Sequence, residues 1–142
     1  MLDQNTSAQL KTLLERLEGP IELVATLDGS DKSAKIQELV SEVAALSDLV
    51  TARFDGTNAR APSFGIAKQG EEPRVFFAGL PMGHEFTSLI LALLQTSGYA
   101  PKVSDEVLAN IKSLGVQSNF DVFVSLSCHN CPDVVQALNL IA

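Results

Sequence analysis

The chain has 142 residues, which is enough for one ordinary domain or two very small ones. Its 17 acidic and 10 basic residues give a net charge of −7 without a cluster of Lys or Arg, so neither nucleic acid nor an anionic membrane surface is expected as a partner. Hydrophobic residues make up 46% and charged residues 19%, a composition that excludes a disordered chain.

The first half of the chain begins with alternating helix and strand patterns. Four leucines on one face, at helical spacing, predict a helix over residues 6–17. The short apolar run at 21–27, bounded by turn residues, is typical of a buried strand. A second helix is predicted at 33–45 and a second strand at 50–54.

Two further strands and a helix complete this pattern. Strands are predicted at 63–68 and 75–77, and the short turn-rich gap between them favours an antiparallel hairpin. Because Pro62 precedes the third strand in this order of elements, the Ala61–Pro62 peptide bond is predicted to be cis. Residues 84–95 are predicted to form a helix that is apolar on most sides and therefore buried on most sides. The order of elements is that of a thioredoxin fold, an α/β fold with a right-handed crossover.

The same pattern then starts again. A helix at 105–114 and a strand at 120–126 repeat the first helix and strand at a nearly constant offset, and another helix follows. We therefore divide the chain into a complete thioredoxin-like unit, 1–98, and the truncated start of a second unit, 103–142, and interpret it as part of a longer protein. Helix 84–95 should form the seam between the units, covered by the helix from residue 105 and the strand from residue 120.

Sequence features also bear on the compartment. The longest apolar run, residues 89–94, is far shorter than the roughly 20 residues of a membrane-spanning helix. An acidic residue stands near the N-terminus where a secretion signal has Lys or Arg, and no long apolar stretch follows. We expect a cytoplasmic protein with no membrane partner.

The two cysteines, Cys128 and Cys131, form one Cys-x-x-Cys between a predicted strand and a predicted helix. This context is typical of a redox dithiol. The N–H groups and dipole at the start of the helix favour a thiolate on Cys128, and Cys131, one turn later, can resolve a mixed disulfide. A structural disulfide is an alternative. A zinc site is a weaker one, because zinc needs four ligands and the chain has only two Cys and two His.

Other parts of the sequence bear on the interpretation of this motif. His129, between the cysteines, either tunes the Cys128 thiolate with positive charge or is an exposed spacer. The corresponding loop of the first unit, residues 28–32, has no cysteine, so the first unit is predicted to be redox-inactive. No glycine-rich nucleotide-binding motif occurs, so no cofactor is expected to bind within this chain.

Four stretches of the chain resemble the N-terminal domain of the flavoprotein subunit of bacterial alkyl hydroperoxide reductases. They are Pro-Ile-Glu-Leu-Val-Ala-Thr-Leu-Asp at 20–28, Pro-Ser-Phe at 62–64, Gly-His-Glu-Phe-Thr-Ser-Leu at 83–89 and Ser-Leu-Ser-Cys-His-Asn-Cys-Pro-Asp-Val-Val-Gln-Ala-Leu-Asn-Leu at 125–140. The resemblance implies two fused thioredoxin-like units, the second of which carries the redox-active pair. It also implies a longer protein that binds FAD and NADH elsewhere, so the fragment alone is not expected to be active.

The resemblance also implies a function. The dithiol would take electrons from the flavin-binding part and pass them to the peroxiredoxin subunit, which reduces peroxides. Glu85 would accept the proton of the resolving thiol, although a first-turn acid can also simply complement a helix dipole. His84 is expected to cap a helix or lie at an interface. The alternative function is a non-catalytic module that docks the peroxiredoxin, against which the intact cysteine pair argues.

Overall fold

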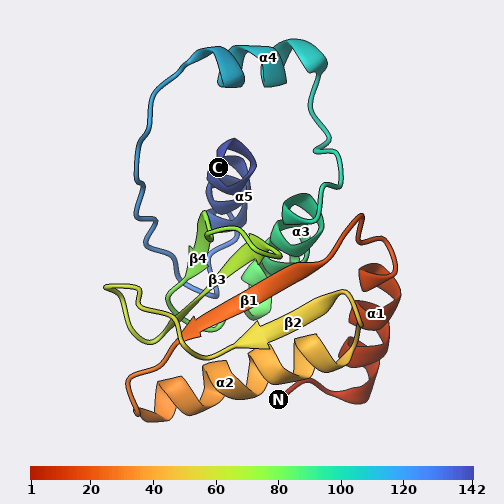
Figure 1. Ribbon diagram of the computed structural model, residues 1–142, viewed down its shortest axis with the longest axis vertical. Helices are drawn as coiled ribbons and strands as arrows, with labels where there is room; N and C mark the ends of the chain where they lie inside the picture. Colours follow the sequence, from red (N-terminus) through yellow and green to blue (C-terminus); the bar gives the residue numbers. More distant parts are fainter.

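The computed structural model describes residues 1–142 (Figure 1). Its elements are α1 (Gln4–Leu14), β1 (Ile21–Thr26), α2 (Asp31–Ala45), β2 (Val50–Arg53), β3 (Ser63–Lys68), β4 (Val75–Phe77), the 3₁₀ turn η1 (Gly83–Glu85), α3 (Phe86–Thr96), α4 (Asp105–Ser113) and α5 (Cys131–Ile141). Apart from the strand expected at 120–126, every predicted element is present, with ends that differ by a few residues.

The four strands form one sheet in the order β2-β1-β3-β4. Strands β1 and β2 are parallel and are joined through α2, whereas β1 pairs antiparallel with β3, and β3 with β4. The parallel pairing predicted for the crossover and the predicted antiparallel hairpin are therefore both confirmed. The Ala61–Pro62 peptide bond at the entry to β3 is cis, as the sequence predicts.

The hydrophobic core is formed by residues of this sheet and of the helices that pack against it. Helix α2 contacts β1, β2 and β3, while α3 contacts β3 and α1. The core cluster of 18 buried residues draws all its members from between Leu10 and Leu94. The first two helices begin at side-chain caps, because Asp3 accepts a hydrogen bond from the Thr6 N–H and Ser30 from the Ser33 N–H. None of the helices has the length and apolar character that crossing a membrane requires.

The strand predicted at residues 120–126 is absent. Residues 114–130 contain no helix or strand, and Phe120 and Phe123 are 67% and 83% exposed. The alternation of apolar residues in this segment matches a strand, but a strand also needs a neighbour that accepts its backbone hydrogen bonds. No strand of the sheet provides that neighbour, because the sheet has only four members and this segment pairs with none of them.

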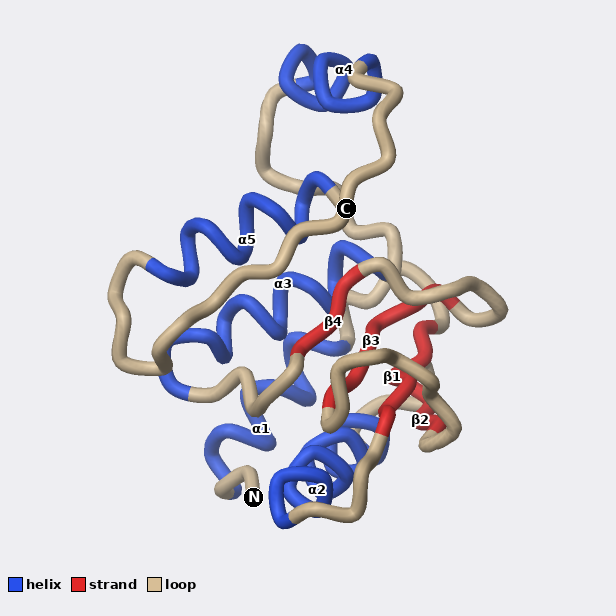
Figure 2. Tube along the Cα trace, turned by 90° about the vertical axis from the view of Figure 1, so that its left-hand side faces the viewer, coloured by secondary structure: helices blue, strands red, loops and turns tan.

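Helix α3 packs against the C-terminal part of the chain, as predicted for residues 84–95, but its neighbour there differs from the predicted one. Helix α3 contacts β3 and α5, whereas α4, the helix from residue 105, is not among its main neighbours. Figures 1 and 2 show α4 at the far end of an excursion between α3 and α5, well away from the sheet. Its Val107 is 44% exposed, and Val122 is 38% exposed. The apolar face of α5 covers α3 instead.

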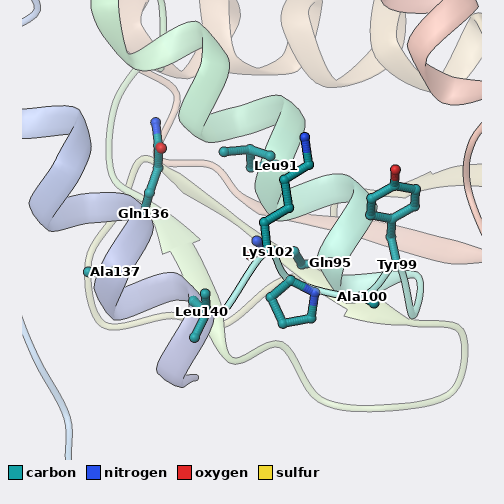
Figure 3. A pocket seen from close by; sticks show the side chains of 9 residues that line it. Leu91, Gln95, Tyr99, Ala100, Lys102, Gln136, Ala137 and Leu140 are labelled. Atoms are coloured by element: carbon teal, nitrogen blue, oxygen red, sulfur yellow. The ribbon is translucent and has the colours of Figure 1, made fainter. Parts of the chain in front are cut away.

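Polar and apolar contacts both join α3 to α5. The Gln136 side chain donates from Nε2 to Oγ of Ser88, at 3.1 Å. Beside this bond lies a cavity of about 350 Å³, whose lining includes Leu91 of α3 and Ala137 and Leu140 of α5 (Figure 3). Helix α5 is thus attached to α3 by a hydrogen bond and by packing.

Candidate redox site

The two cysteines form a disulfide at the start of α5, with their Cα atoms 5.5 Å apart. We call residues 125–131 the redox turn. Cys131 is the first residue of α5, and its backbone N–H donates to Sγ of Cys128 at 3.2 Å. Pro132 occupies the first helical turn, where its missing N–H costs little. Both cysteines are half-buried. When the disulfide is reduced, the same N–H and the helix dipole favour a thiolate on Cys128, the member of the pair that precedes the helix.

Glu85 is the last residue of η1 and is only 2% exposed. Neither of its carboxylate oxygens has a hydrogen-bond partner. An unpartnered buried carboxylate is costly, so its presence indicates a role other than stability. Glu85 thus belongs to an element, η1, that contacts α5.

The backbone of η1 touches the redox turn directly. The His84 N–H donates to the Leu126 carbonyl oxygen at 3.4 Å. Gly83, with φ of +59°, packs so closely that a Cβ on it would lie 3.0 Å from the same oxygen. The rings of His84 and His129 also meet, with centroids 4.4 Å apart and planes inclined by 56°.

A second tie joins the first unit to the segment before the redox turn. Arg60 pairs through Nη2 with a carboxylate oxygen of Asp121 at 2.8 Å, and its guanidinium lies 5.8 Å from the Phe123 ring centroid. All three residues are exposed, so the pair is solvent-screened and contributes modestly to stability.

The structure thus brings some predicted residues together and separates one. Cys128, His129 and Cys131 share the redox turn, and Glu85 lies in η1, which touches that turn. Pro62 precedes β3 in the first unit, on a different element. His84 contacts Leu126 and His129, in line with the expected interface position, whereas no sequence motif indicates the contacts of Arg60. No group of three or more His, Cys, Asp or Glu side chains is arranged to hold a metal ion.

The turn between β1 and α2, where the sequence predicts the counterpart of the redox turn, is held by polar hydrogen bonds. A carboxylate oxygen of Asp28 accepts from the Ser30 N–H at 2.9 Å and from the Ser33 hydroxyl at 2.7 Å. Hydrogen bonds from Ser30 and Ser33 lower the pKa of Asp28 from 3.8 to about 2. With a charged carboxylate in place of a dithiol, this turn cannot exchange disulfides.

The lowered pKa of Asp28 predicts an acid-dependent loss of stability. Since the folded pKa is below the unfolded one, this contribution is complete above about pH 4 and disappears as the pH falls through about 2. Urea unfolding at pH 5, 3 and 2 should therefore show a smaller acid-induced fall in Asp28→Asn than in the unmodified chain. Asp48→Asn, at an exposed loop position, serves as the control, and an equal fall in both variants would contradict the assignment.

Comparisons with known proteins show what this chain is similar to. No protein-family model matches the chain. The chain is 54% identical, over all 142 residues, to the AhpF subunit of the alkyl hydroperoxide reductase of Pseudomonas putida, and spans 27% of the length of that relative. The NTD_N/C domain of alkylhydroperoxide reductase AhpF from Enterococcus faecalis matches 99% of this chain, with 74% of its own chain covered, a TM-score of 0.83 and 25% identity. The chain is homologous to the N-terminal domain of AhpF.

The likeness to AhpF extends over both halves of the chain and includes the redox turn. A protein disulfide oxidoreductase from Aeropyrum pernix has the same thioredoxin-like fold, with a TM-score of 0.80 at 20% identity, over 100% of this chain and 68% of its own. The homology to AhpF, together with the Cys128–Cys131 disulfide, supports a thiol–disulfide oxidoreductase site at the start of α5.

Proposed function

We propose that the chain is the electron-relay part of a peroxiredoxin reductase of the AhpF type. Its dithiol would receive electrons from a flavin-binding part and pass them to the peroxiredoxin subunit in the cytoplasm. The observation that carries this proposal is the cysteine pair at the start of α5, with the Cys131 N–H directed at the Cys128 sulfur. The homology to AhpF supplies the chemical context.

The relay requires two exchange steps. The Cys128 thiolate attacks the disulfide of the oxidised peroxiredoxin, so that one partner thiol leaves and a mixed disulfide forms. Cys131 then loses its proton and attacks Cys128, which releases the second partner thiol and closes the Cys128–Cys131 disulfide. Two electrons have passed to the partner. Glu85, buried and without a hydrogen-bond partner, is the proposed acceptor of the Cys131 proton.

The residues of this chain do not fit a flavin or nicotinamide dinucleotide. Such groups bind at a glycine-rich turn between a strand and a helix, which the sequence lacks. The cavity between α3 and α5 is lined mainly by apolar side chains with Lys102 at its edge, and no helix N-terminus is among its lining residues (Figure 3). We therefore assign the FAD and NADH sites to the remaining part of a full-length protein.

The test is the midpoint potential of the pair in the full-length protein. The protein is equilibrated with dithiothreitol buffers, its thiols are alkylated, and the peptide with residues 128–131 is quantified by mass. We expect a potential near that of thioredoxin, about −270 mV, and no bound zinc. A potential well below about −300 mV, which is typical of a structural disulfide, would contradict the relay and leave the docking module as the better explanation.

A further inference from the structure

The chain contains only two histidines, and they are in contact. His84 belongs to η1 of the first unit, immediately before Glu85, whereas His129 lies between the two cysteines. Both residues are exposed, so burial in the core does not force their rings together. Their centroid distance of 4.4 Å and inclination of 56° correspond to a tilted aromatic pair.

Few other contacts hold the redox turn in place. It is preceded by an exposed segment without helix or strand, and α5 begins only at Cys131. The turn contacts η1 through the hydrogen bond from His84 to Leu126, the close approach of Gly83 to Leu126 and the pair of rings. In the oxidised form the disulfide itself also closes the turn. In the dithiol and mixed-disulfide forms that bond is broken, and the non-covalent contacts must keep Cys131 directed at Cys128.

We propose that His84 is a positioning residue for the resolving step. Its ring packs on His129 and holds the redox turn against η1, so that Cys131 remains directed at Cys128. The inference rests on the proposed function, because it assigns a role within the same exchange. His84 acts through the packing of its ring, so a phenylalanine should replace it and an alanine should not.

The attack by Cys128 and the resolution by Cys131 can be measured separately with a small aromatic disulfide in place of the protein partner. The 142-residue chain is reduced, desalted and mixed with dithiobis-nitrobenzoate in a stopped-flow spectrometer. Attack by Cys128 releases one coloured thiolate, and resolution by Cys131 releases the second, so each step has its own phase. Because the chain has only two cysteines, two thiolates per chain report this pair alone.

We expect His84→Ala to slow the second phase about 3- to 10-fold, the range that the loss of one aromatic pair allows, and to leave the first phase within about 2-fold. His84→Phe should restore the second phase. His129→Ala should slow it to a similar degree, and the double variant should be no slower than either single one. Thr87→Ala, at a position next to η1, is the matched control and should leave both phases unchanged.

The contrary outcomes are distinct. Unchanged second phases in His84→Ala, additive losses in the double variant, or no restoration by phenylalanine would each overturn the positioning role. A general loss of structure would slow both phases and lower the thermal midpoint measured by circular dichroism, and that result would also overturn it. Release of only one thiolate per chain by the unmodified protein would instead contradict the relay function itself.

Discussion

Replacement of Cys128 by serine should abolish electron transfer from the chain to a peroxiredoxin, and replacement of Cys131 should trap the partner. The expectation follows from the position of Cys128 before α5, where the Cys131 N–H donates to its sulfur and favours the attacking thiolate. Without Cys128 no mixed disulfide forms. Without Cys131 the mixed disulfide forms but cannot be resolved.

The measurement uses the full-length reductase with its peroxiredoxin and follows NADH oxidation and non-reducing electrophoresis. Cys128→Ser should reduce turnover to background and give no adduct, while Cys131→Ser should give a covalent adduct that thiols dissolve. Ser118→Ala, at an exposed position outside the redox turn, is the control and should keep normal turnover. Adducts that accumulate with Cys128→Ser instead would reverse the roles of the two cysteines.

The second large effect is expected from Glu85→Gln. This change keeps the size of the side chain but removes the group that accepts the Cys131 proton in the proposed mechanism. General-base assistance contributes about 10²–10⁴-fold to rates, so we expect resolution to slow by about 100-fold. In the two-phase assay with dithiobis-nitrobenzoate, the release of the second thiolate should report this loss, while the first phase changes little.

The thermal stability of the Glu85→Gln variant should be equal to or higher than that of the unmodified chain. The Glu85 carboxylate is buried without a partner, and a neutral amide of the same shape costs less to bury than a charge. The thermal midpoint of Glu85→Gln should therefore be no lower than that of the unmodified chain. Asp133→Asn, at an exposed acid in the first turn of α5, is the matched control. Equal second phases in both variants would remove Glu85 from the mechanism.

Local signals in the sequence account for most of the fold. The spacing of the apolar residues and the positions of Gly and Pro predict the helices and the four strands. Each of those elements buries one face in the structure, and its apolar residues show that face in the sequence. The cis bond at Pro62 and the start of a helix at the cysteine pair were also predictable, since both depend on the order of elements. In these places local preference and tertiary environment agree.

The features that could not be predicted depend on long-range contacts. The segment 120–126 has a strand pattern but no strand to pair with, and a pattern along one segment does not report that absence. The sequence does not show which helix packs against α3, because α4 and α5 both have apolar residues. The contact of His84 with His129 joins two exposed residues, and periodicity carries no information about such pairs.

The close approach of Gly83 to Leu126 has a consequence for protein engineering. Because the redox motif lies on one continuous segment, it would be expected to work when transferred alone into a related protein. Here the graft would leave behind the backbone that the motif rests on, because the Leu126 carbonyl needs a glycine in a left-handed conformation opposite it. A transplant of residues 125–141 should therefore carry the Gly83–Glu85 turn with it, and the smallest transferable redox device is discontinuous in sequence.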